Sequence, residues 1–585
     1  ADPNCEAAGG VLQGGVCKTS FIDQLAILPA ENRFQMFSEF AYDVTDSVKA
    51  YGEFSFSRNK VKAILGSPFY SNGLVKGGST FVPADHPFNF FVLNEAGNGL
   101  TYIDPANWDN NIHQAVDVVA KSRPFGVYTT GDSPSGINNA LDIDFDYHRA
   151  VAGFETDIGE TWTLNTSYVY AVGKRTETTH LGLSSTTFND AVIDGGFNPF
   201  GTAISNPGLI SPKDGTSVAG NSEDELAGIL HAFVDETYSE QQVIESIASG
   251  DLIDLDAGTV GLAVGAQYRY EDYRYTPDSL SAKGLGFGST PSASISGDTN
   301  VFALFAELFV PLHDDVEVQT ALRYEDYDTA GSTLDPKVAV KWNINDQWIL
   351  RSSFGTSFQA PTNLQTGETL GGAFIDDPVS VQNGVPVCHP TGTSNYVYIT
   401  TKGSDDLKPS KAKSWNLGLV YQPTKNLMMK TDLWSFDYSD LVAQDSSATG
   451  IVNDQCAGVA QGGKPKDDPR ITRSAEGQLR EITLNYINTG SVKTSGLDFS
   501  ANYDLDLAAL GELTLGFDST YVATFDIVAI DGQPAIDGAG SYNSSNAFKA
   551  MPQVRANTRA SWQLDGHSVN ASVRYISSYD NDLTA

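Results

Sequence analysis

The sequence predicts an all-β protein, a transmembrane antiparallel β-barrel with long extracellular loops. Apolar and polar residues alternate strictly between Asp298 and Pro361. The alternating segments reach about ten or more residues, the length that a tilted strand needs to cross a bilayer. The connections between such segments fall into a short set and a long set, which is the asymmetry of a barrel with short periplasmic turns.

The segment from Asp298 to Pro361 separates its residues into two faces. The apolar face carries Phe302, Leu304, Ala306, Leu308, Val310, Val316, Val318, Leu322, Tyr324, Val338, Val340, Trp342, Trp348, Leu350 and Phe354. The other face carries Glu307, Glu317, Gln319, Arg323, Glu325, Lys337, Lys341, Arg351 and Ser353. A soluble sandwich also alternates, but its strands are usually about 5 to 6 residues long. Strand length therefore favours the membrane barrel.

The same hairpin pattern recurs along the chain, and eight short turns join two strands each. The expected turns lie at Asp43 to Ser47, Asp157 to Glu160, Asp256 to Gly258, His313 to Asp315, Asn343 to Asp346, Gln422 to Asn426, after Tyr503, and at Leu564 to Gly566. These turns predict about 16 strands, the first beginning near Phe34 and the last ending near Tyr575.

Two features accompany the hairpins. Leu226, Ile229, Leu230, Phe233 and Val234 follow helical spacing behind an acidic start at Glu223, which predicts a short helix in that loop. Four tryptophans on the apolar face lie close to short turns, where an aromatic girdle is expected. They are Trp162, Trp342, Trp348 and Trp562. The other interpretation of these tryptophans is that they are core residues in a soluble fold.

Composition excludes several classes of function. With a formal net charge of −36, the chain offers no clustered basic face for nucleic acid. The sequence contains no run of about 18 apolar residues, so no transmembrane helix is predicted. The sequence lacks G-x-S-x-G, H-E-x-x-H and P-loop motifs, so we expect neither an enzyme nor a cofactor. The Asp-rich segment from Asp526 to Gly540 does not have EF-hand spacing, and no metal site is expected.

The four cysteines fall into two separated pairs in Gly/Pro/Asn-rich stretches, Cys5 with Cys17 and Cys388 with Cys456. Such pairs predict loop disulfides in an oxidising compartment. A zinc site is the weaker interpretation, because neither pair has the spacing of a metal knuckle.

The second half of the chain resembles the TonB-dependent receptors of Gram-negative outer membranes, in particular the large subgroup with paired loop cysteines. The segments Leu350 to Pro361 and Asn488 to Asp498 are similar to strand-end motifs of that family, although Gln359 stands where Arg is more usual. Shorter matches extend the resemblance over most of Gly250 to Ala585.

The resemblance implies active uptake across the outer membrane of a Gram-negative bacterium. A solute would bind at the outer surface, and an inner-membrane energy-transducing complex would act on a plug inside the barrel. No plug-like segment precedes the first strand, so residues 1–585 are expected to be a partial transmembrane barrel domain. The barrels of this family have 22 strands. With about 16 strands expected in residues 1–585, three strands are expected before the first of them and three after the last. We therefore expect a gap several strands wide between the first and last strands.

The charged residues on the polar face are expected to line the lumen, where they would suit contact with a plug. They are Arg149, Glu155, Arg269, Glu271, Arg323, Arg351, Arg555 and Arg574. A passive porin with a charged eyelet would use the same residue types and is the alternative. Leu322 and Leu350 should face lipid, because a slip by one residue would place arginine in hydrocarbon.

The long loops suggest ligand contacts but do not identify the solute. An iron-siderophore, a vitamin and an oligosaccharide are the candidate solutes. Aromatic loop residues could stack on a ligand, although such residues more often pack the loop itself. They are Tyr70, Phe88, Phe90, Phe91, Tyr102 and Trp108. We expect a monomer surrounded by outer-membrane lipid. A soluble extracellular adhesin or glycan-binding β protein is the alternative from another class.

Overall fold

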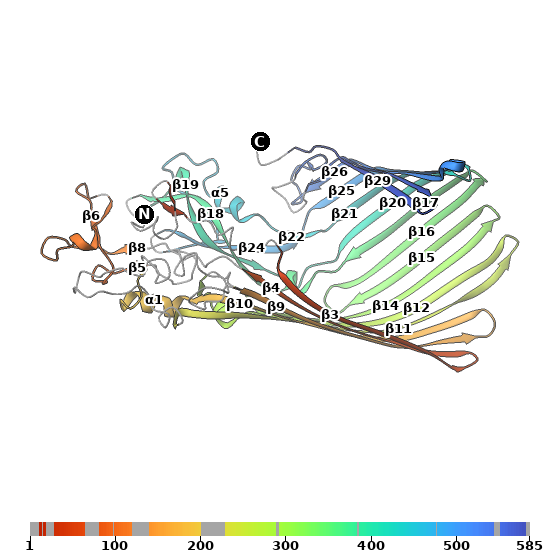
Figure 1. Cartoon of the computed structure of the whole chain (residues 1–585), viewed down its shortest axis with the longest axis horizontal. Coiled ribbons are helices and arrows are strands. Elements are labelled where there is room, and N and C mark those ends of the chain that lie inside the picture. The colour runs from red at the N-terminus through yellow and green to blue at the C-terminus, as the bar shows by residue number, and fades with distance from the viewer. Residues whose placement is uncertain are drawn as a thin grey trace.

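The computed structural model covers the chain and describes residues 11–13, 16–18, 28–64, 81–97, 99–119, 140–199, 228–287, 292–382, 385–474, 477–542 and 550–580. Long antiparallel strands make up most of it, and they slant side by side with the short turns at one end and the longer connections at the other (Figure 1). No helix in these ranges is long and apolar enough to cross a membrane.

Sixteen long strands build the wall of the barrel. They are β3 (Ala30–Thr45), β4 (Val48–Ile64), β9 (Ala140–Ile158), β10 (Trp162–Ser184), β11 (Leu230–Leu255), β12 (Gly258–Thr276), β14 (Ile295–His313), β15 (Val316–Tyr327), β16 (Gly331–Asn345), β17 (Trp348–Gln359), β20 (Ser410–Thr424), β21 (Leu427–Ser439), β25 (Ser491–Asp506), β26 (Glu512–Val528), β28 (Val554–Leu564) and β29 (His567–Ile576). Each of the eight expected short turns joins two of them, so the barrel class, the turns and the strand number are confirmed.

Shorter elements lie in the connections. The short strands are β1 (Val11–Gln13), β2 (Val16–Lys18), β5 (Phe81–Val82), β6 (Phe91–Leu93), β7 (Leu100–Tyr102), β8 (Val118–Val119), β13 (Gly286–Phe287), β22 (Val442–Gln444), β23 (Ile471–Arg473) and β27 (Ile536–Asp537). Longer loop strands are β18 (Thr369–Gln382), β19 (Val385–Lys402) and β24 (Leu479–Asn488). The helical pieces are η2 (Pro105–Asn107), α1 (Ser185–Ile193), α3 (Ser279–Ala282), α4 (Asn363–Thr366), α5 (Ala448–Asp454) and η3 (Ala508–Leu510).

The long strands follow one another around the wall in chain order, from β3 to β29. Paired residues join the long strands in turn from β3 to β29. Within the described ranges no residue of β29 is paired with a residue of β3, and both strands are exposed along their whole length. The expected gap several strands wide between these two strands stays a prediction.

The helix expected behind Glu223 is wrong from Leu230 onward. Residues 228 and 229 are helical, but β11 begins at Leu230, and Phe233 and Val234 pair with Thr179 and Thr178 of β10. The part of the expected helix before residue 228 lies outside the described residues. From Leu230 onward, β11 is paired with β10 over most of its length. The ladder hydrogen bonds satisfy the backbone N–H and C=O groups of this segment, so it does not need helical hydrogen bonds.

Two of the long connections fold together into a unit that we call the cap, residues 369–402 and 442–488. Its sheet runs in the order β18-β19-β24-β22, with β23 beside β24. The pairing of β19 with β24 is parallel, and it joins the connection after β17 to the connection after β21. Buried apolar side chains hold the cap together, among them Val397, Ile451, Val452 and Ile482.

The predicted disulfide Cys388–Cys456 lies in the cap and is confirmed. It fixes the β18–β19 hairpin to the segment after α5. Beside it, Arg473 donates to Asp377 at 2.6 Å and to Gln455 at 2.7 Å, and the Asp377 side chain is almost fully buried. The other predicted pair is untested, because Cys5 and the side chain of Cys17 lie outside the described residues.

Candidate binding site on the charged face of the wall

The charged side chains of the wall form bridges between strands that are not paired with each other. Arg269 on β12 donates to the hydroxyl of Tyr327 on β15 at 3.2 Å, and Tyr327 donates to Glu325 at 2.7 Å. Strand β14 lies between them, and its residue at this level, Val301, is only 1% exposed. The long polar side chains therefore cover the small strand residue beneath them.

The same arrangement repeats one step further along these strands. Arg323 on β15 donates to Gln267 on β12 at 3.3 Å, above Ala303 of β14, which is fully buried. Gln267 in turn donates to Glu245 on β11 at 2.6 Å. Arg323 also donates to Glu325 and lies 5.2 Å from the centre of the Phe305 ring. These contacts connect four neighbouring strands into one polar network.

Glycine serves as the covered residue in another bridge. Tyr51 donates to Asn165 at 2.7 Å, although β9 lies between their strands with Gly153 opposite Tyr51. A Cβ at Gly153 would lie 2.6 Å from the Tyr51 hydroxyl. Because Gly153 has no side chain, the tyrosine can cross the strand.

The predicted charged residues separate into paired and unpaired ones. Arg149 pairs with Glu53 at 2.6 Å, Arg351 pairs with Asp432 at 2.6 Å, and Arg269 pairs with Glu271 at 3.1 Å. Arg574 donates only to Asn557, at 3.4 Å, and Arg555 makes no ion pair with any residue in the described ranges. Most of the positive charge on this face is therefore already neutralised by the wall.

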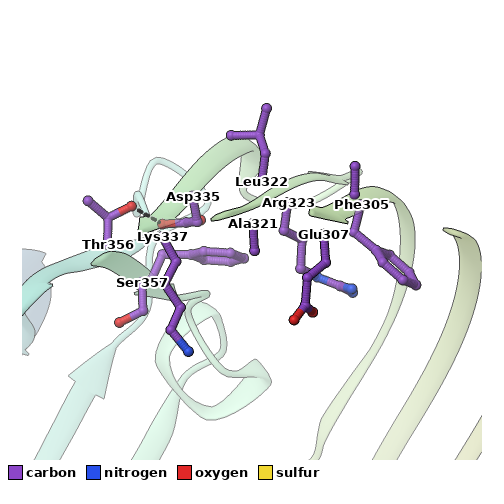
Figure 2. A pocket seen from close by; sticks show the side chains of 11 residues that line it. Phe305, Glu307, Ala321, Leu322, Arg323, Asp335, Lys337, Thr356 and Ser357 are labelled. Atoms are coloured by element: carbon purple, nitrogen blue, oxygen red, sulfur yellow. Dashed lines mark hydrogen bonds between the residues drawn. The ribbon is translucent and has the colours of Figure 1, made fainter. Parts of the chain in front are cut away.

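Beside the polar network the charged face is hollowed. The hollow has a volume of about 380 Å³, at the low end of the size range of small-molecule sites. Figure 2 shows Leu322 pointing away from the side to which Arg323 and its neighbours point, as the alternation predicts. The hollow is lined by Phe305, Ala306, Glu307, Ala321, Leu322, Arg323, Asp335, Lys337, Thr356, Ser357 and Phe358.

The aromatic loop residues pack against one another. Phe88 and Phe90 are buried, and the Phe90 ring lies 5.3 Å from Trp108 and 6.4 Å from Tyr102. Phe91 lies 5.3 Å from Tyr102. This packing favours their interpretation as a loop core. Tyr70 lies outside the described residues.

The sequence pattern did not single out the hollow or the bridges. Lys337 is among the residues that the alternation places on the charged face, and Asp335 is not. The signal in the sequence is Ala321, a small residue between the long polar residues Gln319 and Arg323 on that face. Small residues opposite long polar ones mark Gly153 and Ala303 in the same way.

The described residues contain no group of three or more potential His, Cys, Asp or Glu ligands for a metal ion.

The comparisons with known proteins agree with this architecture. A "Probable TonB-dependent siderophore receptor PirA" of Acinetobacter baumannii is 22% identical over 245 residues, which are 41% of this chain and 30% of that protein. A mutant of the ferric enterobactin receptor PfeA of Pseudomonas aeruginosa superposes with a TM-score of 0.50 at 12% identity, covering 95% of this chain and 59% of that one.

The RagAB peptide transporter superposes with a TM-score of 0.52 at 12% identity, covering 94% of this chain and 58% of that one. The chain thus spans less than two thirds of the length of each of these proteins. The family described as "TonB dependent receptor-like, beta-barrel" matches residues 84–585, so the chain belongs to the TonB-dependent receptor-like β-barrel family.

Proposed function

We propose that this chain is the transmembrane barrel of a receptor that takes up a scarce solute by energised transport. The family match over residues 84–585 carries the proposal. Proteins of this family lie in the outer membrane of Gram-negative bacteria, and this chain is an outer-membrane protein of the same kind. An iron-siderophore is the solute class that we propose, supported by the similarity to the Acinetobacter siderophore receptor and the Pseudomonas ferric enterobactin receptor.

In this proposal the charged face lines the lumen and the apolar face contacts lipid. Arg323 and Leu322 point to opposite sides of the sheet, so only one of them can face hydrocarbon. An arginine on the lipid side costs about 2 to 4 kcal/mol near the bilayer midplane. The paired arginines described above would cost still more, because their carboxylate partners would also lose water.

The proposed partners follow from the same function. An inner-membrane energy-transducing complex would drive uptake through a plug within the lumen, and the cap would cover the mouth on the long-loop side. The protein would act as a monomer, with outer-membrane lipid around the apolar face.

Uptake of radioactive iron tests the proposal. The full-length gene product is produced in Gram-negative cells that lack their own siderophore receptors, and the cells are fed a panel of ferric siderophores with and without a protonophore. We expect accumulation of at least one complex that stops when the protonophore is added. Equal solute flux with and without it, reproduced by liposome swelling, would instead identify a passive porin. Energised uptake of a vitamin or an oligosaccharide in place of iron would correct the solute class.

A further inference from the structure

We propose that the hollow beside the polar network binds an amino-acid-type group, with the ligand's ammonium at Asp335 and its carboxylate at Lys337. This inference rests on the proposed function in one respect, since the hollow must be open to the lumen for a solute to reach it. It goes further by stating what chemistry the solute carries.

The hollow exists because neighbouring strands diverge next to a small residue. The pairing of β16 with β17 ends at Lys337 and Gly355, although both strands continue for several residues beyond this point. The next residue of β16 beyond this end is Pro336, which has no N–H to donate to β17. On the adjacent strand β15, Ala321 leaves room beneath the side chains around it. The result is a recess in the wall (Figure 2).

Asp335 has one carboxylate oxygen in use and one without a partner. Its Oδ1 accepts a hydrogen bond from the Thr356 hydroxyl at 2.8 Å. Its Oδ2 is buried and has no hydrogen-bond partner among the described residues. A buried acceptor of this kind is costly unless a donor reaches it. A cationic donor is the best match for a carboxylate, because charge-assisted hydrogen bonds are about twice as strong as neutral ones.

Lys337 supplies the opposite charge on the same strand and the same face. Lys337 is exposed, and its ammonium makes no ion pair or hydrogen bond with any residue in the described ranges. The two residues are two positions apart, so their backbone positions are separated by about 6 to 7 Å along the strand. Asp335 and Lys337 are not paired with each other, and a ligand with both charges can therefore satisfy the two together.

The other cation of the hollow, Arg323, is already paired with Glu325, which narrows the ligand class. Arg323 donates to Glu325 and Gln267, and Glu307 accepts from Gln319. Phe305, Ala321 and Phe358 add apolar surface to the lining. A ligand that carries one ammonium, one carboxylate and an apolar side chain fits this set, whereas a polyanion would find a single free cation in the lining that the structure describes.

The dipeptide alanyl-leucine is a suitable probe, together with its N-acetylated form and its C-terminal amide. Binding to the full-length protein in detergent is measured by isothermal titration or by saturation-transfer NMR. We expect the dipeptide to bind at least about tenfold more tightly than either analogue, because each analogue loses one charge-assisted hydrogen bond. Asp335→Asn should abolish the discrimination against the N-acetylated form, and Lys337→Gln should abolish the discrimination against the amide.

Lys341→Gln is the matched control, since Lys341 lies on the same strand and face but pairs with Glu317 at 3.3 Å, outside the hollow. It should leave all three affinities unchanged. Heat-modifiable migration in gels verifies that each variant is folded. Equal affinity for the three probes, or no binding of the dipeptide at millimolar concentration, overturns the inference. The binding measurement needs no energised membrane. If the dipeptide does not bind but iron uptake is intact, only the ligand site in the hollow is refuted. If the dipeptide binds but no uptake occurs, only the proposed transport function is refuted.

Discussion

Arg351 on β17 donates to the carboxylate of Asp432 on β21 at 2.6 Å, and the residue between them on β20 is Gly418. A Cβ at Gly418 would overlap Asp432 Oδ1 and lie 2.6 Å from Arg351 Nε. The ion pair therefore depends on the absence of a side chain on the strand that it crosses. The same relationship links Tyr51 to Asn165 above Gly153.

Gly418→Ala should break the Arg351–Asp432 bridge while leaving the barrel folded. The two side-chain ends can move away from the new methyl group, so we expect a loss of about 1 kcal/mol in the free energy of unfolding, as for a partly exposed charged hydrogen bond. Urea titration of gel heat-modifiability measures it. Gly355→Ala on β17 is the control, because a Cβ there meets its nearest atom, Lys337 Cγ, at 3.4 Å. A Gly355→Ala variant as unstable as Gly418→Ala would contradict the bridge as the cause.

Removing the disulfide should loosen the cap and leave the barrel intact. Cys388 and Cys456 are 68 residues apart in the sequence, and closing a loop of this size is worth about 2 to 5 kcal/mol. We expect the Cys388→Ser/Cys456→Ser variant to be cleaved by protease within residues 369–402 and 442–488, whereas heat-modifiability stays normal. Cleavage in the barrel hairpins at the same rate would show that the cap does not fold as a separate unit.

Arg473→Met should destabilise the cap more than any exposed substitution in it. The Asp377 side chain is 2% exposed, so removal of its partner leaves a buried charge at a cost of about 3 to 5 kcal/mol. Hydrogen exchange in β18 and β24 reports the loss. The double variant Arg473→Met/Asp377→Asn should recover part of the protection, because the unpaired charge is gone. Lys464→Met is the control, as Lys464 forms an exposed pair with Asp467.

Acid should weaken the segment before β23. The paired hydrogen bonds from Arg470 to Asp468, at 2.8 and 3.0 Å, are the main cause that holds the pKa of Asp468 below its ordinary value. A lowered carboxyl pKa stabilises the folded state fully above the ordinary pKa, about 3.9, and this contribution is lost as the pH falls through the lowered pKa.

Hydrogen exchange of residues 468–473 between pH 2 and 6 tests this expectation, after correction for the intrinsic exchange rate. Protection should decline only in the acidic part of the range, and Asp468→Asn should show no such decline. A decline of the same size in Asp468→Asn would assign the acid sensitivity to another group.

The sequence predicted the parts of the fold in which a strand has one apolar face and one charged face. In β15, β16 and β17 the alternation is strict, and the turns after His313 and Asn345 are where it placed them. The first part of β11 was missed because the regular apolar alternation of the other wall strands is absent from Phe233 to Glu240. The hollow was missed for a different reason: it depends on where the pairing of β16 with β17 ends, and no residue pattern within one strand records that.

The parallel pairing of β19 with β24 constrains how the mouth of the barrel can open. These strands come from connections that follow different hairpins, and Cys388–Cys456 ties the same two connections a second time. Neither connection can swing outward alone without breaking the ladder between residues 398–402 and 481–485. If the proposed uptake uses this side, the two connections are expected to move together, and a kinetic trace of ligand exchange should contain one opening phase for both.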